Sequence, residues 1–411
     1  MAKREFDVIV WGATGFTGQL VTEYLAGQYG VKNTLRWAIA GRNLDKLEAV
    51  REDCLSKNQR SSLPILLADS EDPASLAALV ARTKVVCTTV GPYAKYGTPL
   101  VAACVEAGTD YCDLTGEVQW MARVIPAYQG AAEASGARIV HTCGFDSIPF
   151  DIGNWYLQQA MLEQHGVPAI HVKTRVARTS GAASGGTVAS MLNIMEETAH
   201  DPGIRDLIAD PYVLNPPGAP TGPDGPDQED ARFDPDFDQW TFPFIMALVN
   251  TRVVRRSNAL LGFPWGENFR YDEAVLSRSR YLANLTAIGS RLGMMAMAIT
   301  PTRKLAARLL PSPGEGPSRR QRERGFYEIF LHGVHPQDRS KDMRLKVTGD
   351  MDPGYGSTAK MLGEASVSLA LDKPAVGGGF WTPASAMGAT LQQRLAANAG
   401  LSFEFVDPHP A

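Results

Sequence analysis

The most chemically informative stretch of the sequence is a glycine-rich segment close to the N-terminus. It reads Gly12-Ala13-Thr14-Gly15-Phe16-Thr17-Gly18, directly after an apolar run at 6–11 and before a plausible helix at 19–26. Glycines let the backbone turn tightly and approach a pyrophosphate, whose charge then lies on the free amides and positive dipole of the helix N-terminus. The segment and its context therefore predict a dinucleotide-binding loop.

The residue after the second apolar run predicts which dinucleotide this loop binds. The run at 35–40 is followed by Gly41 and Arg42, in the place where an NAD site usually carries an acid for the ribose 2′-hydroxyl. A guanidinium there would pair with a 2′-phosphate, so NADPH is the expected cofactor, although a solvated surface arginine is the alternative. Asp69, at the end of the third run, either accepts hydrogen bonds from the adenine amino group or simply ends its strand.

The turn after the fourth apolar run carries most of the candidate catalytic groups. It reads Gly91-Pro92-Tyr93-Ala94-Lys95-Tyr96, where a doubly wound fold holds the nicotinamide ring. Gly91 and Pro92 are expected to lie against the cofactor. Tyr93 is the first choice of proton donor, followed by Lys95 and Tyr96, although tyrosines near turns often serve only in packing.

One further candidate group follows the last apolar run of the predicted sheet. Residues 143–151 include Asp146 and Ser147, just before a helix expected to start near Asp151. These side chains either face the predicted cleft, where a carboxyl group can exchange protons, or cap that helix. Both interpretations stay open on the sequence alone.

The elements that must position these residues alternate between strands and helices. Apolar runs at 6–11, 35–40, 64–68, 84–90 and 138–142 are typical of buried parallel strands, and a helix is predicted from Thr98 to Gly108. The predicted fold class is α/β, with an N-terminal Rossmann-type, doubly wound parallel sheet in residues 1–150. Ligands of such sheets bind beyond the carboxyl ends of the strands, where all the candidate residues lie.

The alternation ends near residue 151, so a second domain is predicted over 151–411. Residues 169–179 alternate apolar and polar side chains, as a strand with one solvated face does. We expect an α+β domain for substrate binding or dimerisation. Its charges are unevenly distributed: residues 196–240, net −10, are interpreted as an acidic, mobile insertion, and residues 252–324, net +9, as a basic segment.

Composition excludes several classes of protein. The chain has 411 residues, 44% of them hydrophobic, with 40 basic and 44 acidic side chains and a net charge of −4, which argues against a nucleic-acid-binding protein. The five cysteines, all in the first 143 residues, lack metal-ligand spacing and are expected to be buried reduced thiols; no metal is predicted. Neither a signal peptide nor a run of 18 apolar residues is seen, so a cytoplasmic location is expected.

Taken together, several motifs make the sequence resemble the saccharopine dehydrogenase-like oxidoreductases, and most of all their trans-acting enoyl reductase branch. The resemblance covers nearly the whole chain. It implies an NADPH-dependent reductase that acts in trans on the enoyl-thioester intermediate of a polyketide synthase making long-chain glycolipids. No catalytic acid is carried over from the family. The motifs are residues 12–18, Ala40-Gly41-Arg42, Gly91-Pro92-Tyr93, residues 107–117, Gly144-Phe145-Asp146-Ser147-Ile148-Pro149, residues 313–318, Asp352-Pro353-Gly354-Tyr355 and residues 382–388.

Three functional hypotheses follow. The first is conjugate reduction of an acyl thioester, with Tyr93 as donor, a backbone amide near Gly91 or the Lys95 ammonium as oxyanion partner, and the basic segment attracting an acidic acyl carrier protein. The second is an amino-acid dehydrogenase acting on a carbon–nitrogen bond, with Arg175 or Arg178 holding substrate carboxylates.

The third hypothesis is a non-catalytic, lipid-associated NADP-binding protein. Residues 278–310 interleave arginines with the apolar run 292–299, as interfacial helices do, although a buried helix with solvated ends is the alternative. Peripheral contact with the plasma membrane and a homodimer are further expectations.

Overall fold

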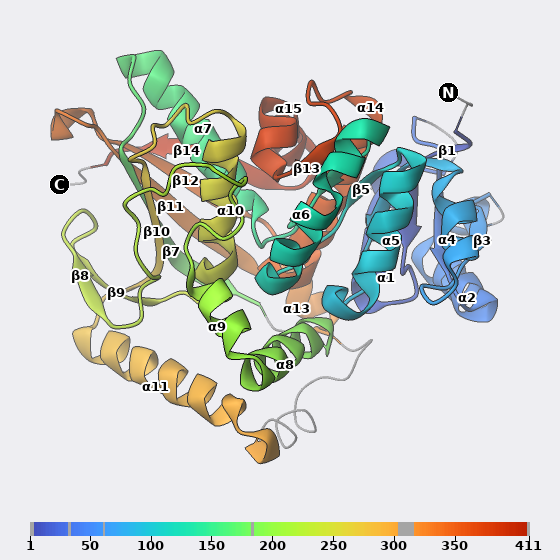
Figure 1. Cartoon of the computed structure of the whole chain (residues 1–411), viewed down its shortest axis with the longest axis horizontal. Coiled ribbons are helices and arrows are strands. Elements are labelled where there is room, and N and C mark those ends of the chain that lie inside the picture. The colour runs from blue at the N-terminus through green and yellow to red at the C-terminus, as the bar shows by residue number, and fades with distance from the viewer. Residues whose placement is uncertain (1–3, 32–33, 61, 182–184, 303–315, 409–411) are drawn as a thin grey trace.

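Two sheets organise the chain, and they lie side by side in Figure 1. The computed structural model describes residues 4–31, 34–60, 62–181, 185–302 and 316–408, and within these residues each sheet has seven strands. The first sheet occupies the right half of the figure and the second sheet the left half.

The first sheet is parallel throughout, with the strand order β13-β6-β5-β4-β1-β2-β3. The order reverses between β1 and β4, which places the ligand crevice of a doubly wound fold at their carboxyl ends. The predicted Rossmann-type α/β fold is confirmed. The strands are β1 (Phe6–Trp11), β2 (Trp37–Gly41), β3 (Ile65–Leu67), β4 (Thr83–Thr88), β5 (Asp110–Cys112), β6 (Arg138–Val140) and β13 (Gly379–Trp381).

Helices cover both faces of this sheet. One face packs against α1 (Phe16–Tyr29), α2 (Leu44–Cys54) and α14 (Thr358–Leu371), with a short α3 (Lys57–Arg60) after α2. The other face packs against α4 (Pro73–Val80), α5 (Tyr93–Ala107) and α6 (Val118–Ser135). The predicted helix start at Thr98 is wrong, since α5 begins at Tyr93 and contains Pro99, but it ends at Gly108 as expected.

Strand β13 shows that a boundary at residue 150 does not separate the two sheets. It pairs in parallel with β6, and Arg138 donates a 3.2 Å hydrogen bond to the carbonyl of Pro374 just before it. Helix α14 also packs on β1, β4 and β5 of the first sheet. The expected domain 1–150 is therefore incomplete, and the expected domain 151–411 contains part of the first sheet. A three-residue strand is too short to show a periodic pattern in the sequence.

The second sheet is mixed, with the order β14-β12-β11-β7-β10-β9-β8. Only β7 and β10 pair in parallel, and the strand predicted over 169–179 is confirmed as β7. The strands are β7 (His171–Ser180), β8 (Arg232–Asp234), β9 (Gln239–Pro243), β10 (Arg270–Ser277), β11 (Phe326–Val334), β12 (Met343–Gly349) and β14 (Leu401–Val406).

Helices α7 (Ile148–His165) and α10 (Ala247–Leu260) pack against the second sheet, and α7 also contacts α15 (Pro383–Asn398). Three more helices, α8 (Gly185–His200), α9 (Pro202–Ala209) and α11 (Arg280–Ala298), lie along the lower edge of the molecule in Figure 1, where α8 contacts both of the others. A short α13 (Arg319–Arg324) precedes β11.

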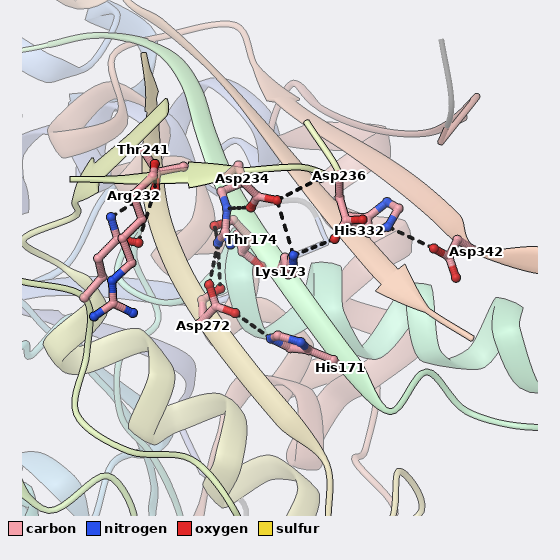
Figure 2. Close-up of polar contacts among 12 residues, drawn as sticks. His171, Lys173, Thr174, Arg232, Asp234, Asp236, Thr241, Asp272, His332 and Asp342 are labelled. Carbon is pink, nitrogen blue, oxygen red and sulfur yellow. Dashed lines mark hydrogen bonds and ion pairs between the residues drawn. The ribbon is translucent and has the colours of Figure 1, made fainter. Parts of the chain in front are cut away.

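The acidic insertion is held at several carboxylates by cations of the second domain. Figure 2 shows Asp234 and Asp236 against Lys173, at 3.2 and 2.5 Å, on the face of the second sheet. Asp224 accepts a 2.8 Å hydrogen bond from Arg255, a residue of the predicted basic segment. The oppositely charged segments therefore neutralise each other within the fold.

The basic segment is accordingly not one cationic surface. Arg252, Arg255 and Arg256 are each at least 96% buried on α10, where Arg252 pairs with Asp227 and Arg256 donates to the carbonyl of Phe380. Residues 303–315, which include three more cations of the segment, lie outside the described residues.

The sequence predicts buried, reduced cysteines and no membrane-spanning segment. All five cysteines are free thiols, and only Cys54 is not fully buried. Among the described residues there is no helix with the length and apolarity needed to cross a bilayer.

Candidate cofactor and active site

The glycine-rich loop connects β1 to α1 and leaves the start of α1 open. Gly12 adopts φ +85°, and its amide donates to the carbonyl of Ala40 at 3.0 Å. A Cβ on Gly18 would lie 2.2 Å from the carbonyl oxygen of Gly12, so only glycine fits there. The N-cap residue of α1 is Gly15, which has no side chain to occupy the first-turn amides. Those amides are free to bind an anion such as pyrophosphate.

The end of β4 closes over the loop. Thr89 donates a 3.2 Å hydrogen bond to the carbonyl of Gly12, and a Cβ on Gly12 would meet Val90 Cγ2 at 2.5 Å. The loop therefore lies directly beside the turn that begins at Gly91, as a dinucleotide spanning both requires.

Segments distant in sequence converge on Phe16 of the loop. Its ring meets Tyr355 edge to face, with centroids 5.3 Å apart, and the Arg322 guanidinium lies 5.5 Å from its centroid. The Asp352 carboxylate accepts hydrogen bonds from the amides of Tyr355 and Gly356, at 3.0 and 2.8 Å. Two of the resemblance motifs, 313–318 and 352–355, thus reach the loop, although 313–315 lie outside the described residues.

Arg42 and Asp69 follow neighbouring strands on the adenosine side of the crevice. Arg42 is exposed directly after β2, one residue before Asn43 caps α2. Asp69 accepts a 3.0 Å hydrogen bond from the amide of Glu71 through one carboxylate oxygen. Arg42 is thus available for a 2′-phosphate, whereas the adenine contact of Asp69 stays a prediction.

Tyr93 lies beneath the β4–α5 turn rather than on its surface. The side chain is buried and stacked on Trp120, with ring centroids 5.6 Å apart. Its hydroxyl donates to the carbonyl of Thr88 at 3.3 Å and accepts from the amide of Leu114 at 3.4 Å. Burial, followed by the nearby charge of Asp113, raises the pKa of the phenol well above its usual value. The geometry does not favour Tyr93 as the proton donor, whereas Lys95 and Tyr96 are exposed on the next residues of α5.

Glu117 is a site residue to which the sequence analysis gave no role. Its buried carboxylate accepts hydrogen bonds from the amides of Tyr93 and Ala94, at 2.8 and 2.9 Å, and from the Ser190 hydroxyl at 2.9 Å. Burial raises the pKa of Glu117, and these three hydrogen bonds partly oppose that rise. Glu117 thereby caps α5 and explains its early start. It also fixes α8 over the turn, where a Cβ on Gly91 would lie 3.6 Å from Ser190 Oγ.

Asp146 is the candidate whose environment best suits proton transfer. It lies between β6 and α7, at the carboxyl end of the first sheet, and its Oδ1 is buried without a hydrogen-bond partner among the described residues. Burial raises the pKa of Asp146 from 3.8 to about 7. The predicted alternative of a helix cap is not observed, because Ser147 is the N-cap residue of α7 and makes no side-chain capping bond there. Asp146 therefore presents a carboxyl group that is neutral over part of the physiological pH range.

A second buried acid, on the other sheet, lies within electrostatic range of Asp146. Glu273, on β10, accepts hydrogen bonds from Asn250 at 3.0 Å and from the Tyr271 hydroxyl at 2.8 Å. Burial raises the pKa of Glu273 to about 8, with smaller contributions from the charges of Asp227 and Asp146. Two carboxyl groups whose pKa values are raised by burial thus influence each other across the two sheets.

The loop that carries Asp146 is held by neighbouring elements. The amide of Phe145 donates to the Thr358 hydroxyl at 2.9 Å, and Thr358 donates to the carbonyl of Pro353 at 2.8 Å. Asp113, fully buried, accepts from the amide of Thr142 at 3.1 Å and lies 2.7 Å from His141 Nδ1. The 352–355 motif therefore supports both the phosphate loop and the Asp146 loop.

One of the two arginines expected to hold substrate carboxylates is already paired. Arg175 is 4% exposed and binds Asp234 and Asp272, at 2.7 and 2.6 Å. Arg178 is exposed and lies over the ring of Phe326, 4.9 Å from its centroid. Arg175 is therefore not available to bind a dicarboxylate, which weakens the structural support for the amino-acid dehydrogenase hypothesis.

The residues present fit NADPH. The uncapped start of α1 supplies amide donors for the two phosphates of the pyrophosphate, and two glycines that no larger residue can replace let the backbone approach them. The exposed arginine at the ribose position supplies donors for the 2′-phosphate. Within the described residues, no group of three or more side chains is suited to hold a metal ion.

Comparisons with known proteins agree with this geometry. Residues 8–140 match the family described as the saccharopine dehydrogenase NADP binding domain. A Mycobacterium tuberculosis (strain ATCC 25618 / H37Rv) protein named "Putative trans-acting enoyl reductase" is 42% identical over 416 residues, which cover 98% of this chain and 97% of the relative. A trans-acting enoyl reductase of Mycobacterium bovis (strain BCG / Pasteur 1173P2) is 38% identical over 96% of both chains.

A solved structure shares the fold. The apo histidine-tagged saccharopine dehydrogenase (L-Glu forming) from Saccharomyces cerevisiae superposes with a TM-score of 0.54, over 97% of this chain and 99% of that one. Its sequence identity is 12%, so the likeness concerns the fold alone.

Proposed function

The chain belongs to the saccharopine dehydrogenase-like family of NADP-dependent oxidoreductases, together with the trans-acting enoyl reductases, and from this premise we propose that it reduces the carbon–carbon double bond of an enoyl thioester. Identity to relatives of that name over nearly the whole chain supports the proposal. The observation that carries it is Asp146, at the carboxyl end of the first sheet, whose Oδ1 is buried without a partner among the described residues and whose pKa is raised by burial to about 7.

Each part of the crevice has a role in this reaction. The first-turn amides of α1 bind the pyrophosphate, Arg42 binds the 2′-phosphate, and Gly91 with Pro92 forms the floor under the nicotinamide. When bound, NADPH supplies the hydride that the β-carbon of the substrate accepts.

Asp146 completes the reduction as general acid. Addition at the β-carbon leaves negative charge on the thioester oxygen, and the Asp146 carboxyl group gives its proton to the α-carbon, becoming a carboxylate that solvent reprotonates. The amides of Tyr93 and Ala94 do not serve the oxyanion, because Glu117 already holds them. The Lys95 ammonium and the backbone at Gly91 are the groups left for that role.

The thioester is presented by a separate acyl carrier protein, in the synthesis of a polyketide-derived lipid. This context follows the resemblance of the sequence, and the names of the relatives support only trans-acting enoyl reduction. The cationic site for an acidic carrier is α13, where Arg319, Arg320 and Arg324 are exposed next to Arg322, which contacts the phosphate loop. The buried arginines of α10 take no part in it.

NADPH consumption by the purified protein tests the proposal. The substrates are a trans-2-enoyl thioester on coenzyme A, the same acyl group on an acyl carrier protein, and α-ketoglutarate with lysine. Consumption with an enoyl thioester alone supports conjugate reduction, and a preference for the carrier-bound form supports the docking partner. Consumption with α-ketoglutarate and lysine contradicts the proposed reaction. So does the absence of consumption with every substrate when NADPH still binds.

A further inference from the structure

Helix α11 exposes an unusually large apolar surface. Eight large apolar side chains along it are 54–74% exposed: Tyr281, Leu282, Leu285, Ile288, Leu292, Met294, Met295 and Ile299, the last at the C-cap position. We call the six that align along one side of the helix, Tyr281, Leu285, Ile288, Leu292, Met295 and Ile299, the α11 face. With 19 residues the helix is about 28 Å long, so the face far exceeds the scattered apolar residues of an ordinary surface.

The helix packs on the rest of the protein through its opposite side. Ala283 and Ala287 are 0% and 5% exposed, and the helix contacts β9 and α8. Tyr281, Leu285, Ile288, Leu292 and Met295 follow one another at spacings of four and three, which aligns them on the side away from these alanines. Figure 1 shows α11 at the lower edge of the molecule, beyond β8 and β9. The buried helix considered from sequence is therefore not what the fold contains.

The segment that contains α11 carries charge of a single sign. Residues 274–314 contain six Lys or Arg and no Asp or Glu. Arg278, Arg280 and Arg291 are exposed, with Arg280 lying 5.1 Å from the Trp240 ring centroid. In the described parts of the chain, the carboxylate paired with them is Asp230, 3.8 Å from Arg291, in a pair whose side chains are both more than 60% exposed.

We infer that the α11 face is a docking surface for an anionic lipid bilayer, with the helix lying in the plane of the interface. An amphipathic helix of this type buries its apolar side chains in the acyl region and its arginines among anionic headgroups. A second copy of the chain is less suitable, since pairing of two such faces brings arginines together without compensating carboxylates. An acidic carrier protein would meet the six apolar side chains of the α11 face and only three described cations.

Sedimentation with vesicles tests this inference on the full chain. The protein is mixed at low salt with sucrose-loaded vesicles of phosphatidylcholine and phosphatidylglycerol, or of phosphatidylcholine alone. We expect sedimentation with the anionic vesicles, weakened about tenfold or more with neutral vesicles or at high salt.

Two sets of variants separate the apolar and the charged contributions. Ile288→Glu with Leu292→Glu should abolish sedimentation, whereas Ile245→Glu, which changes an isoleucine of the same 58% exposure between β9 and α10, should leave it unchanged. Arg278→Gln with Arg291→Gln should remove the preference for anionic vesicles. Retained NADPH binding shows that each variant is folded.

Three results would overturn the inference. In the first, the wild-type chain stays in the supernatant with anionic vesicles. In the second, Ile288→Glu with Leu292→Glu leaves sedimentation unchanged. In the third, the wild-type chain is a dimer in solution that does not bind vesicles, and these substitutions convert it to a monomer. Because this readout needs no turnover, its failure is distinguishable from failure of the proposed reaction.

Discussion

The hydroxyl of Ser190 donates a hydrogen bond of 2.9 Å to Oε1 of Glu117, the carboxylate that also holds the first two amides of α5. One buried side chain therefore joins the helix that covers the site to the turn that forms its floor. The position of that floor relative to α8 therefore depends in part on this carboxylate.

Removal of Glu117 should be more damaging than removal of its side-chain partner. Glu117→Ala leaves two buried amides and one hydroxyl without an acceptor, so unfolding free energy should fall by about 2–4 kcal/mol, measured by urea denaturation. Ser190→Ala removes only one donor and should cost about 1 kcal/mol or less. Equal losses for the two variants would show that the carboxylate does not cap α5.

Glycine at position 18 should be required for the cofactor loop. Gly18→Ala places a methyl group against the Gly12 carbonyl and should abolish NADPH binding, measured by fluorescence titration. Gly27→Ala, in the same helix with open space around it, should leave binding intact and stabilise the protein by about 0.5–1 kcal/mol. NADPH affinity unchanged in Gly18→Ala would place the pyrophosphate elsewhere.

Arg42 should determine the preference for NADPH over NADH. Arg42→Ala removes a charge-assisted contact with the 2′-phosphate, so NADPH affinity should fall about 10- to 100-fold while NADH affinity stays the same. Lys46→Ala, an exposed cation in the first turn of α2, is the matched control and should change neither. A similar loss for both dinucleotides in Arg42→Ala would mean that the guanidinium does not contact the 2′-phosphate.

Asp146 should give turnover a dependence on pH. The protonated carboxyl group is the active form, so kcat should be constant below pH 7 and fall about tenfold per unit above it. Asp146→Asn should lower kcat about 100-fold or more with NADPH binding retained, whereas Tyr93→Phe should keep most of its turnover. The reverse pattern would restore Tyr93 as the donor.

The same shift has a consequence for stability. Because the pKa of Asp146 is higher in the folded chain than its usual 3.8, the folded state holds a proton that the unfolded state has lost. Stability contributed by this group is therefore present below about pH 4 and is lost as the pH rises towards 7. Asp146→Asn should flatten that part of the stability profile.

The buried arginines of α10 should matter for folding rather than for binding a partner. Arg255→Met leaves Asp224 buried without its main partner and should reduce unfolding free energy by about 3–5 kcal/mol. Arg291→Ala, which breaks an exposed pair with Asp230, should change it by about 0.5 kcal/mol or less. A small effect of Arg255→Met would mean that the insertion is not held by this ion pair.

Local patterns in the sequence were sufficient for the contiguous strands of the parallel sheet and for the glycine loop, because a strand, its turn and the next helix are contiguous in the chain, whereas β13 was missed. Glu117 could not be found in this way, since its partners at 93, 94 and 190 share no spacing with it. The arginines at 252, 255 and 256 looked like an exposed basic run because sequence does not report burial. Their acidic partners come from a different segment, and only the tertiary fold brings them together.

Strand β13 also determines when the first sheet can be completed during synthesis. Its residues leave the ribosome more than 230 positions after β6, the strand it pairs with. At about 5–20 residues per second, the edge of β6 stays without its neighbour for on the order of 10–50 s in the nascent chain. Throughout that interval β6 is a free parallel edge of the kind that aggregates or recruits chaperones, so the sheet that begins first in the chain waits for one of the last strands to be made.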